Sequence, residues 1–99
     1  MRQVMVRYKV KPDQTVRNEE LVRAVYEELR EAQPSRFRYA TYKLDDGVSF
    51  VHIARYDSDQ SGNPLAEIVA FARFQQGINE RCDETPVVTE LSEVGSFGD

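Results

Sequence analysis

The sequence has no tryptophan, and it has one cysteine and one histidine among its 99 residues. The single Cys82 cannot form an internal disulfide, which favours a reducing compartment, with the cytoplasm as the default location. One cysteine, one histidine and scattered acids have no recognised spacing for metal ligands. We therefore predict neither a metal nor another bound cofactor.

Long apolar runs and basic clusters are also missing. No stretch approaches the roughly 20 apolar residues that span a bilayer, and the N-terminal MRQVMVRYKV lacks the apolar segment of a secretion signal. Thirteen scattered basic residues against 17 acids give a net charge of −4, which disfavours nucleic-acid and membrane partners. The composition and length predict one globular domain over residues 1–99.

Two amphipathic elements open the chain. Residues 4–10 alternate with period two, which predicts a strand that stops at Pro12. The segment VRNEELVRAVYEELREAQP has apolar residues at helical spacing, which predicts a helix from near Thr15 or Asn18 to Pro34. One face of the strand carries Val4, Val6, Tyr8 and Val10, and the other carries Met5, Arg7 and Lys9.

The rest of the chain predicts a hairpin, a helix and a last strand. Strands at 37–44 and 48–56 flank Asp46-Gly47, which suits a type I′ turn. After the polar loop 57–63, Asn63-Pro64 resembles a helix N-cap followed by proline, and the helix runs to about Cys82 with a break or a close backbone approach at Gly77. The final strand is predicted at 86–94.

The order β, α, β, β, α, β is that of an α+β, ferredoxin-like fold with a four-stranded antiparallel sheet and both helices on one face. In the hairpin, Val51 and Ile53 alternate with Phe50 and His52 and therefore point to the other face of the sheet, so both faces carry apolar residues. A sheet with one face in water should alternate more cleanly. We predict that a second copy covers the other face and that the protein is a homodimer.

The hairpin YATYKLDDGVSFVHIARY, the helix NPLAEIVAFARFQQGI and the closing PVVTELSEVGSF resemble the dimeric α/β-barrel superfamily, particularly its antibiotic-biosynthesis-monooxygenase-like members. The resemblance implies paired sheets in a barrel with helices outside and a ligand pocket between sheet and helices. Activities implied across the superfamily include cofactor-independent oxygenation of aromatics, haem degradation, isomerisation and simple binding. The missing tryptophan and the lack of a histidine on the second helix disfavour haem degradation.

His52 is the candidate catalytic residue. Its ordinary pKa near 6.5 suits a general base toward a phenol or an enol. Flanked by Val51 and Ile53, it is alternatively explained as a packing residue with a satisfied hydrogen bond. The candidate ligand-binding residues are Tyr39, Tyr42, Phe50, Phe71 and Phe74, which alternatively form core or dimer interface.

Three cations on the strands need partners. Arg7 and Lys9 lie on a central strand, where they are expected to pair with Glu90 or Glu93 on the last strand. An anionic ligand bound near Arg7, Lys9 and Arg55 is the alternative.

Two functions follow from these residues. The first is a non-catalytic, dimeric module that binds a small aromatic or anionic ligand. The second is a cofactor-independent monooxygenase-like enzyme that acts on a small aromatic or quinone-like substrate, with His52 as its base.

Overall fold

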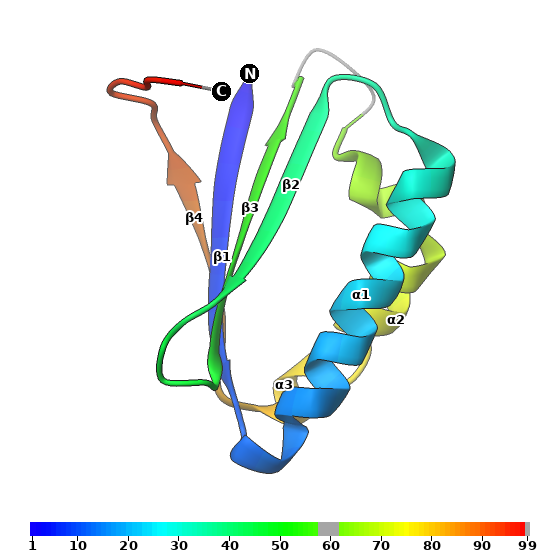
Figure 1. Ribbon diagram of the computed structural model, residues 1–99, viewed down its shortest axis with the longest axis vertical. Helices are drawn as coiled ribbons and strands as arrows, with labels where there is room; N and C mark the ends of the chain where they lie inside the picture. Colours follow the sequence, from blue (N-terminus) through cyan, green and yellow to red (C-terminus); the bar gives the residue numbers. More distant parts are fainter. Residues whose placement is uncertain (58–61, 99) are drawn as a thin grey trace.

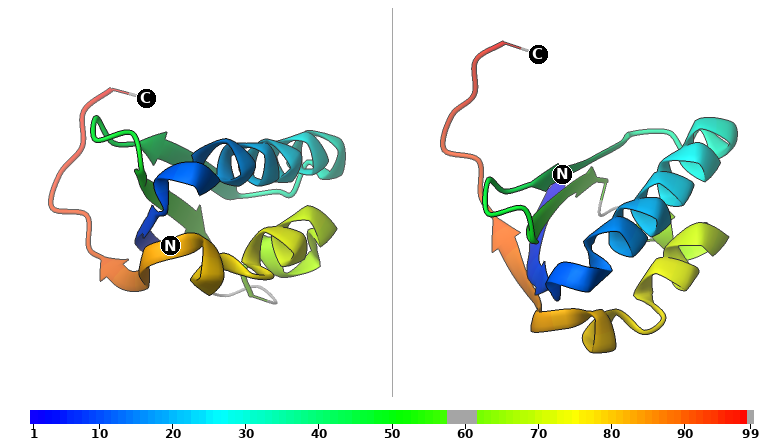
Figure 2. Two further views of the ribbon diagram at one scale, coloured as in Figure 1. Left: turned by 90° about the horizontal axis from the view of Figure 1, so that it is seen from below. Right: turned by 60° about the horizontal axis from the view of Figure 1, so that its bottom comes forward.

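The computed structural model describes residues 1–57 and 62–98 and contains a four-stranded antiparallel sheet with its helices on one side (Figures 1 and 2). The strand order β2-β3-β1-β4 confirms the predicted ferredoxin-like α+β fold. Residues 58–61 of the predicted polar loop lie outside the described residues. The elements are β1 (Arg2–Val10), η1 (Pro12–Gln14), α1 (Thr15–Ala32), β2 (Phe37–Lys43), β3 (Ser49–Tyr56), η2 (Pro64–Glu67), α2 (Val69–Gln75), α3 (Ile78–Arg81) and β4 (Cys82–Leu91).

Helix α1 follows directly from its apolar stripe. Leu21, Val22 and Val25 recur at helical spacing and are buried in the core beneath the sheet. The helix starts at Thr15, one of the two predicted positions. It ends where Gln33 takes the left-handed conformation (φ 46°) and donates its backbone N–H to a carbonyl of the last turn.

The second helical region is three short helices rather than one. The predicted N-cap is confirmed, because Asn63 Oδ1 accepts the backbone N–H of Leu65 at 3.0 Å. The predicted break is confirmed at Gly77, whose φ of 75° separates α2 from α3. Residues with a side chain adopt this conformation at a cost of about 1–2 kcal/mol. Glycine avoids this cost, so the chain changes direction here with little strain.

Helix α2 is held by charged side chains at both ends. The Glu28 carboxylate of α1 accepts the backbone N–H groups of Val69 and Ala70, both at 2.9 Å, and so caps the first turn. The Arg81 guanidinium donates to the carbonyls of Phe74 and Gln76 at 2.5 and 3.0 Å and caps the last turn. These contacts fix a seven-residue helix that is too short to be stable alone.

The hairpin turn is not the predicted type I′ turn. Gly47 donates to the carbonyl of Leu44 at 3.0 Å, and within residues 44–48 only Gly47 has a positive φ. A type I′ turn needs positive φ at both central residues, and Asp46 does not have it. The Asp46 carboxylate instead accepts the Ser49 hydroxyl and the backbone N–H groups of Val48 and Ser49, which lowers its pKa to about 2.

The last strand begins and ends earlier than predicted. It starts at Cys82, opposite Val10, and ends at Leu91 instead of residue 94. The prediction began the strand at Pro86, and proline cannot donate to a ladder. However, β4 is an edge strand, and its register shifts by one residue between positions 84 and 87, so Pro86 falls where no ladder bond is needed.

The sheet has two distinct faces, as the period-two pattern predicted. The helix-side face, beneath the helices, includes Val4, Val6, Tyr8, Tyr39, Thr41, His52 and Ala54. We call the opposite side the open face; it carries Gln3, Met5, Arg7, Lys9, Arg38, Ala40, Tyr42, Val51, Ile53, Arg55, Val87 and Thr89. No helix among the described residues is long and apolar enough to cross a membrane.

The predicted pairing of Arg7 and Lys9 with Glu90 or Glu93 is wrong. Glu90 lies opposite Val4, so its side chain is on the helix-side face of the sheet, where it pairs with Arg2 instead. Glu93 lies beyond the end of β4 and is exposed. Lys9 approaches Glu84 at 3.9 Å, while Arg7 lies exposed on the open face.

Replacing Gly77 with alanine is expected to lower the free energy of unfolding by about 1–2 kcal/mol, because alanine must then hold a φ of 75°. The measurement is equilibrium urea unfolding. Gly95→Ala is the matched control, since its added methyl meets no atom within 4 Å and its φ is not positive. Equal stabilities for the two variants would contradict this account of the break.

Candidate functional site

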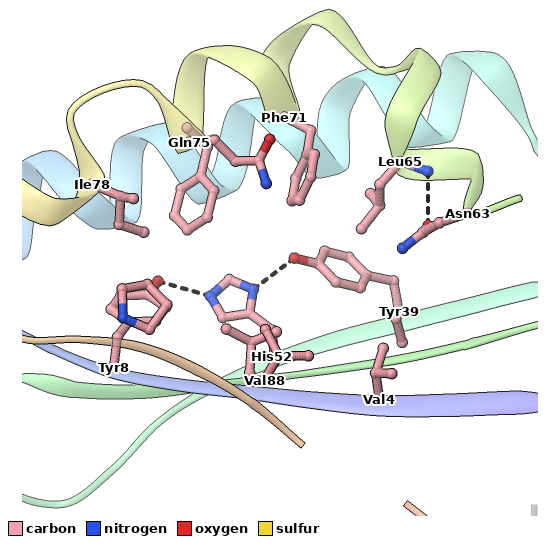
Figure 3. Close-up of a pocket in the computed structure, with 14 residues that line it drawn as sticks. Val4, Tyr8, Tyr39, His52, Asn63, Leu65, Phe71, Gln75, Ile78 and Val88 are labelled. Atoms are coloured by element: carbon pink, nitrogen blue, oxygen red, sulfur yellow. Dashed lines mark hydrogen bonds between the residues drawn. The ribbon is translucent and has the colours of Figure 1, made fainter. Parts of the chain in front are cut away.

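A cavity of about 160 Å³ lies between the helix-side face of the sheet and the short helices (Figure 3). Most of its lining is apolar. On a comparable measure, a cavity of roughly 150 Å³ takes one benzene ring, whereas pockets for drug-sized ligands run to about 300–1,000 Å³. Its lining includes Val4, Val6, Tyr8, Tyr39, His52 and Ala54 from the sheet, with Asn63, Leu65, Phe71, Phe74, Gln75 and Ile78 from the helical side.

His52 forms the centre of the polar wall of the cavity. Its Nε2 lies 2.7 Å from the hydroxyl of Tyr8, and its Nδ1 lies 2.6 Å from the hydroxyl of Tyr39 and 3.0 Å from Thr41 Oγ1. The network continues outward, because Asn18 donates to the Tyr8 hydroxyl at 2.9 Å. Both ring nitrogens of His52 therefore have hydrogen-bond partners.

Strand register brings these groups together. His52 of β3 lies directly opposite Val6 of β1 and Thr41 of β2. Tyr8 and Tyr39 are each two residues along their strands from these positions, and even spacing keeps them on the same face. Two tyrosines from separate strands thus meet one imidazole from the strand between them.

Aromatic rings enclose the network above and beside it. The ring centroid of Phe74 lies 5.3 Å from that of His52, and Phe71 stacks on Phe74 at 6.0 Å. The Arg81 guanidinium lies 5.5 Å from the centroid of Phe74 while it caps α2. The caps on α2 therefore also position the roof of the cavity.

Burial keeps the polar wall uncharged. His52 is 4% exposed, and desolvation lowers its pKa from 6.5 to about 4. Desolvation also raises the pKa of the hydroxyls of Tyr8 and Tyr39 above their ordinary value of 10. At neutral pH the wall is a neutral imidazole between two neutral phenols.

These values bear on the predicted role of His52. Transfer of a proton from a phenol of pKa near 10 to a base with a pKa of about 4 is unfavourable by roughly 8 kcal/mol of free energy. Both of its nitrogens are already hydrogen-bonded. The geometry suits orientation of neighbouring hydroxyls better than proton abstraction.

The predicted ligand-binding residues separate into two groups. Tyr39, Phe71 and Phe74 line the cavity with His52. Phe50 does not line it; it is buried and stacks on Tyr8 at a centroid distance of 5.6 Å, supporting the wall from the core. The prediction that Tyr42 lies beside Phe71 and Phe74 is wrong. Tyr42 is an odd number of positions from Tyr39, so it lies on the open face, where it is 57% exposed.

Sequence reasoning missed Tyr8, Asn18, Asn63 and Gln75. Tyr8 was assigned to an apolar strand face, and only the register with β3 shows that it meets His52. Asn63 was identified only as an N-cap, yet its side-chain nitrogen points toward the cavity (Figure 3). A buried polar residue on an otherwise apolar helix face was the one available signal for Asn18.

The model of the antibiotic biosynthesis monooxygenase family matches residues 1–76. No curated protein matches the chain. The fold is similar to a solved antibiotic biosynthesis monooxygenase, with 18% identity, a TM-score of 0.77 and coverage of 96% of this chain and 100% of that chain.

Two further solved structures share the fold. SnoaB, a cofactor-independent oxygenase from Streptomyces nogalater, is 18% identical with a TM-score of 0.69, covering 99% of this chain and 97% of that chain. NE2512, a protein of unknown function from Nitrosomonas europaea, is 14% identical with a TM-score of 0.73, covering 99% and 93%. At these identities the likeness is one of fold.

His52 is expected to titrate in the folded protein with a pKa of about 4, measured by NMR on the only imidazole of the chain. Because the unfolded chain binds this proton near pH 6.5, the contribution of neutral His52 is complete above that pH and is lost as the pH falls toward 4. Relative to His52→Gln, the free energy of unfolding should fall by about 2–3 kcal/mol between pH 7.5 and 4.5. A folded pKa near 6.5 would contradict this.

Proposed function

Since the chain belongs to the antibiotic biosynthesis monooxygenase family, we propose that it binds a small, uncharged, single-ring aromatic or quinone-like molecule in the cavity beside His52. The observation that carries the proposal is the combination of size and polarity in this cavity. Its walls are aliphatic and aromatic, and its few polar groups converge on one side. Pockets for small ligands commonly combine an apolar lining with a few orienting polar groups.

The charge of the ligand follows from the same walls. None of the described residues that line the cavity is an acid, a lysine or an arginine. An ion that entered would lose its hydration without gaining a counter-charge, which costs several kcal/mol. An uncharged ring avoids this cost, so an anionic ligand does not suit this cavity.

The second candidate function is oxygenation of such a ring without a bound cofactor. The presence of His52, Tyr8 and Tyr39 together in the cavity lining favours it, as does the likeness in fold to SnoaB. The low pKa of His52 weighs against a proton-abstracting role, so binding is the first proposal. Oxygen consumption with a hydroquinone separates the two functions.

Filling the cavity should abolish binding. Ala54 is buried in the cavity wall, and Ala54→Leu places three further carbons there. In NMR titrations with toluene and acetophenone, we expect the parent to bind both and Ala54→Leu to bind at least 10-fold more weakly. Ala24→Leu makes the same change on an exposed face of α1 and should bind like the parent. Parent and Ala54→Leu binding equally would refute the proposed site.

We also propose that the protein is a homodimer in which a second copy covers the open face, and that it works in the cytoplasm. Tyr42 and Val87 on the open face are 57% and 62% exposed, and Val94 and Phe97 of the C-terminal tail are fully exposed. Burying four or five such side chains yields on the order of 5–10 kcal/mol before the cost of association. The free, buried Cys82 thiol supports a reducing location.

Placing a charge at the centre of the open face should separate the dimer. Ile53 lies on β3 between two other strands, and Ile53→Arg adds a cation near Arg7 and Arg55. By analytical ultracentrifugation at micromolar concentration, we expect a dimer for the parent and a folded monomer for Ile53→Arg. Arg23→Ala on the exposed face of α1 serves as the control. A monomeric parent would refute the dimer.

A further inference from the structure

Asn18 lies at the buried end of the polar wall and fixes the direction of the hydrogen bonds along it. Asn18 has no exposed surface, and its Nδ2 donates to the Tyr8 hydroxyl while its Oδ1 has no partner within residues 1–57 and 62–98. The opposite orientation of the amide would leave an N–H₂ group unpartnered in the core. Unpartnered buried donors are rarer than under-used carbonyls, so Asn18 presents its donor to Tyr8.

Within the described part of the chain, the proton of Tyr8 then has one acceptor. Its oxygen already accepts from Asn18, and His52 Nε2 is the only other polar partner that its hydroxyl has among the described residues. If Nε2 carried the proton, the hydroxyl of Tyr8 would be left without an acceptor, although Tyr8 is 2% exposed. That costs about 1–3 kcal/mol, so Tyr8 donates to Nε2.

His52 must therefore carry its proton on Nδ1. A neutral imidazole has one donor and one acceptor, and Nε2 is the acceptor. Both neighbours of Nδ1 are hydroxyl oxygens, Tyr39 at 2.6 Å and Thr41 at 3.0 Å, and the shorter contact is to Tyr39. Tyr39 accepts from His52, which frees its own proton for another acceptor.

Two acceptors can take that proton. Thr41 is within reach, although its hydroxyl is also hydrogen-bonded to Tyr26 at 2.8 Å. The other is a ligand, because Tyr39 lines the cavity (Figure 3). The polar wall thus offers the ligand a hydrogen-bond donor.

We infer that Asn18 is a positioning residue that orients the chain Asn18–Tyr8–His52–Tyr39, so that His52 is the Nδ1–H tautomer and the Tyr39 hydroxyl donates to the ligand. The ligand consequently presents an acceptor there, such as a ring-bound carbonyl. This inference rests on the proposed function for its ligand but not for its tautomer. The Tyr39 hydroxyl would thus distinguish a ketone or quinone from a hydrocarbon of the same shape.

The tautomer is tested without any ligand. The ¹⁵N shifts of the only imidazole at pH 7.5 should show a protonated Nδ1 and an unprotonated Nε2. In Asn18→Asp, an ionised carboxylate accepts from Tyr8 and reverses the chain, so the proton should move to Nε2 as that carboxyl ionises. Asn18→Leu removes the donor to Tyr8 without supplying an acceptor, so it should weaken the preference for Nδ1–H without reversing it.

A parent protein with the proton on Nε2, or shared between the nitrogens, overturns the inference. So does an Asn18→Asp protein that keeps Nδ1–H once its carboxyl has ionised. The parent spectrum requires no variant, so it decides the matter even where a substitution prevents folding.

The acceptor is tested with two probes of nearly equal shape, acetophenone and α-methylstyrene. The affinity of the ketone relative to the alkene should fall roughly 2- to 12-fold in Tyr39→Phe, the fold-change of one ordinary hydrogen bond. Tyr42→Phe on the open face is the matched control and should leave the ratio unchanged. Comparing ratios removes the different hydrophobicity of the two probes.

The outcomes separate this inference from the proposed function. If neither probe binds the parent, the proposed function fails, and the ligand part of the inference fails with it. If both bind and Tyr39→Phe leaves the ratio unchanged, the cavity is a ligand site and the inferred acceptor is wrong. A selective fall in Tyr39→Phe supports both.

Discussion

The hydrogen bonds on both nitrogens of His52 are the constraint on which the site depends. A buried imidazole without partners would be costly, and one beside a carboxylate would ionise more readily. Here the partners are neutral hydroxyls of Tyr8 and Tyr39, each from a strand adjacent to β3. The network joins three strands through side chains and leaves an uncharged polar wall at physiological pH. An apolar cavity beside such a wall excludes ions and accepts a neutral ring.

The cavity also depends on a helix that could not form alone. Helix α2 has seven residues, and its ends are held by Glu28 and Arg81, which lie on other elements. The same helix places Phe71 and Phe74 over the cavity. Stability of α2 and the shape of the cavity are therefore coupled, because the capping groups that stop it from unwinding also fix its aromatic side chains.

The residue pattern predicted the parts of the fold that depend on local repetition. Period two along β1 and β3, helical spacing in α1 and the break at Gly77 all follow from neighbours in sequence. Some predictions that required pairing across the sheet failed, as did the local predictions of a type I′ turn and of a single second helix. Glu90 could not be assigned to Arg2, because the bulge near Pro86 shifts β4 against β1. Tyr42 could have been rejected as a cavity residue by its parity alone, since it differs from Tyr39 by an odd number of positions.

The sequence by itself determined that this chain forms a βαββαβ fold and that His52 lies within a strand rich in apolar and aromatic residues. Only the tertiary structure decided which groups meet the imidazole. Tyr8 and Asn18 are 44 and 34 positions from His52, and their contacts arise from strand register and from the packing of α1 on the sheet. The physical reason is that alternation specifies which face a side chain occupies, whereas its partners depend on how distant segments align.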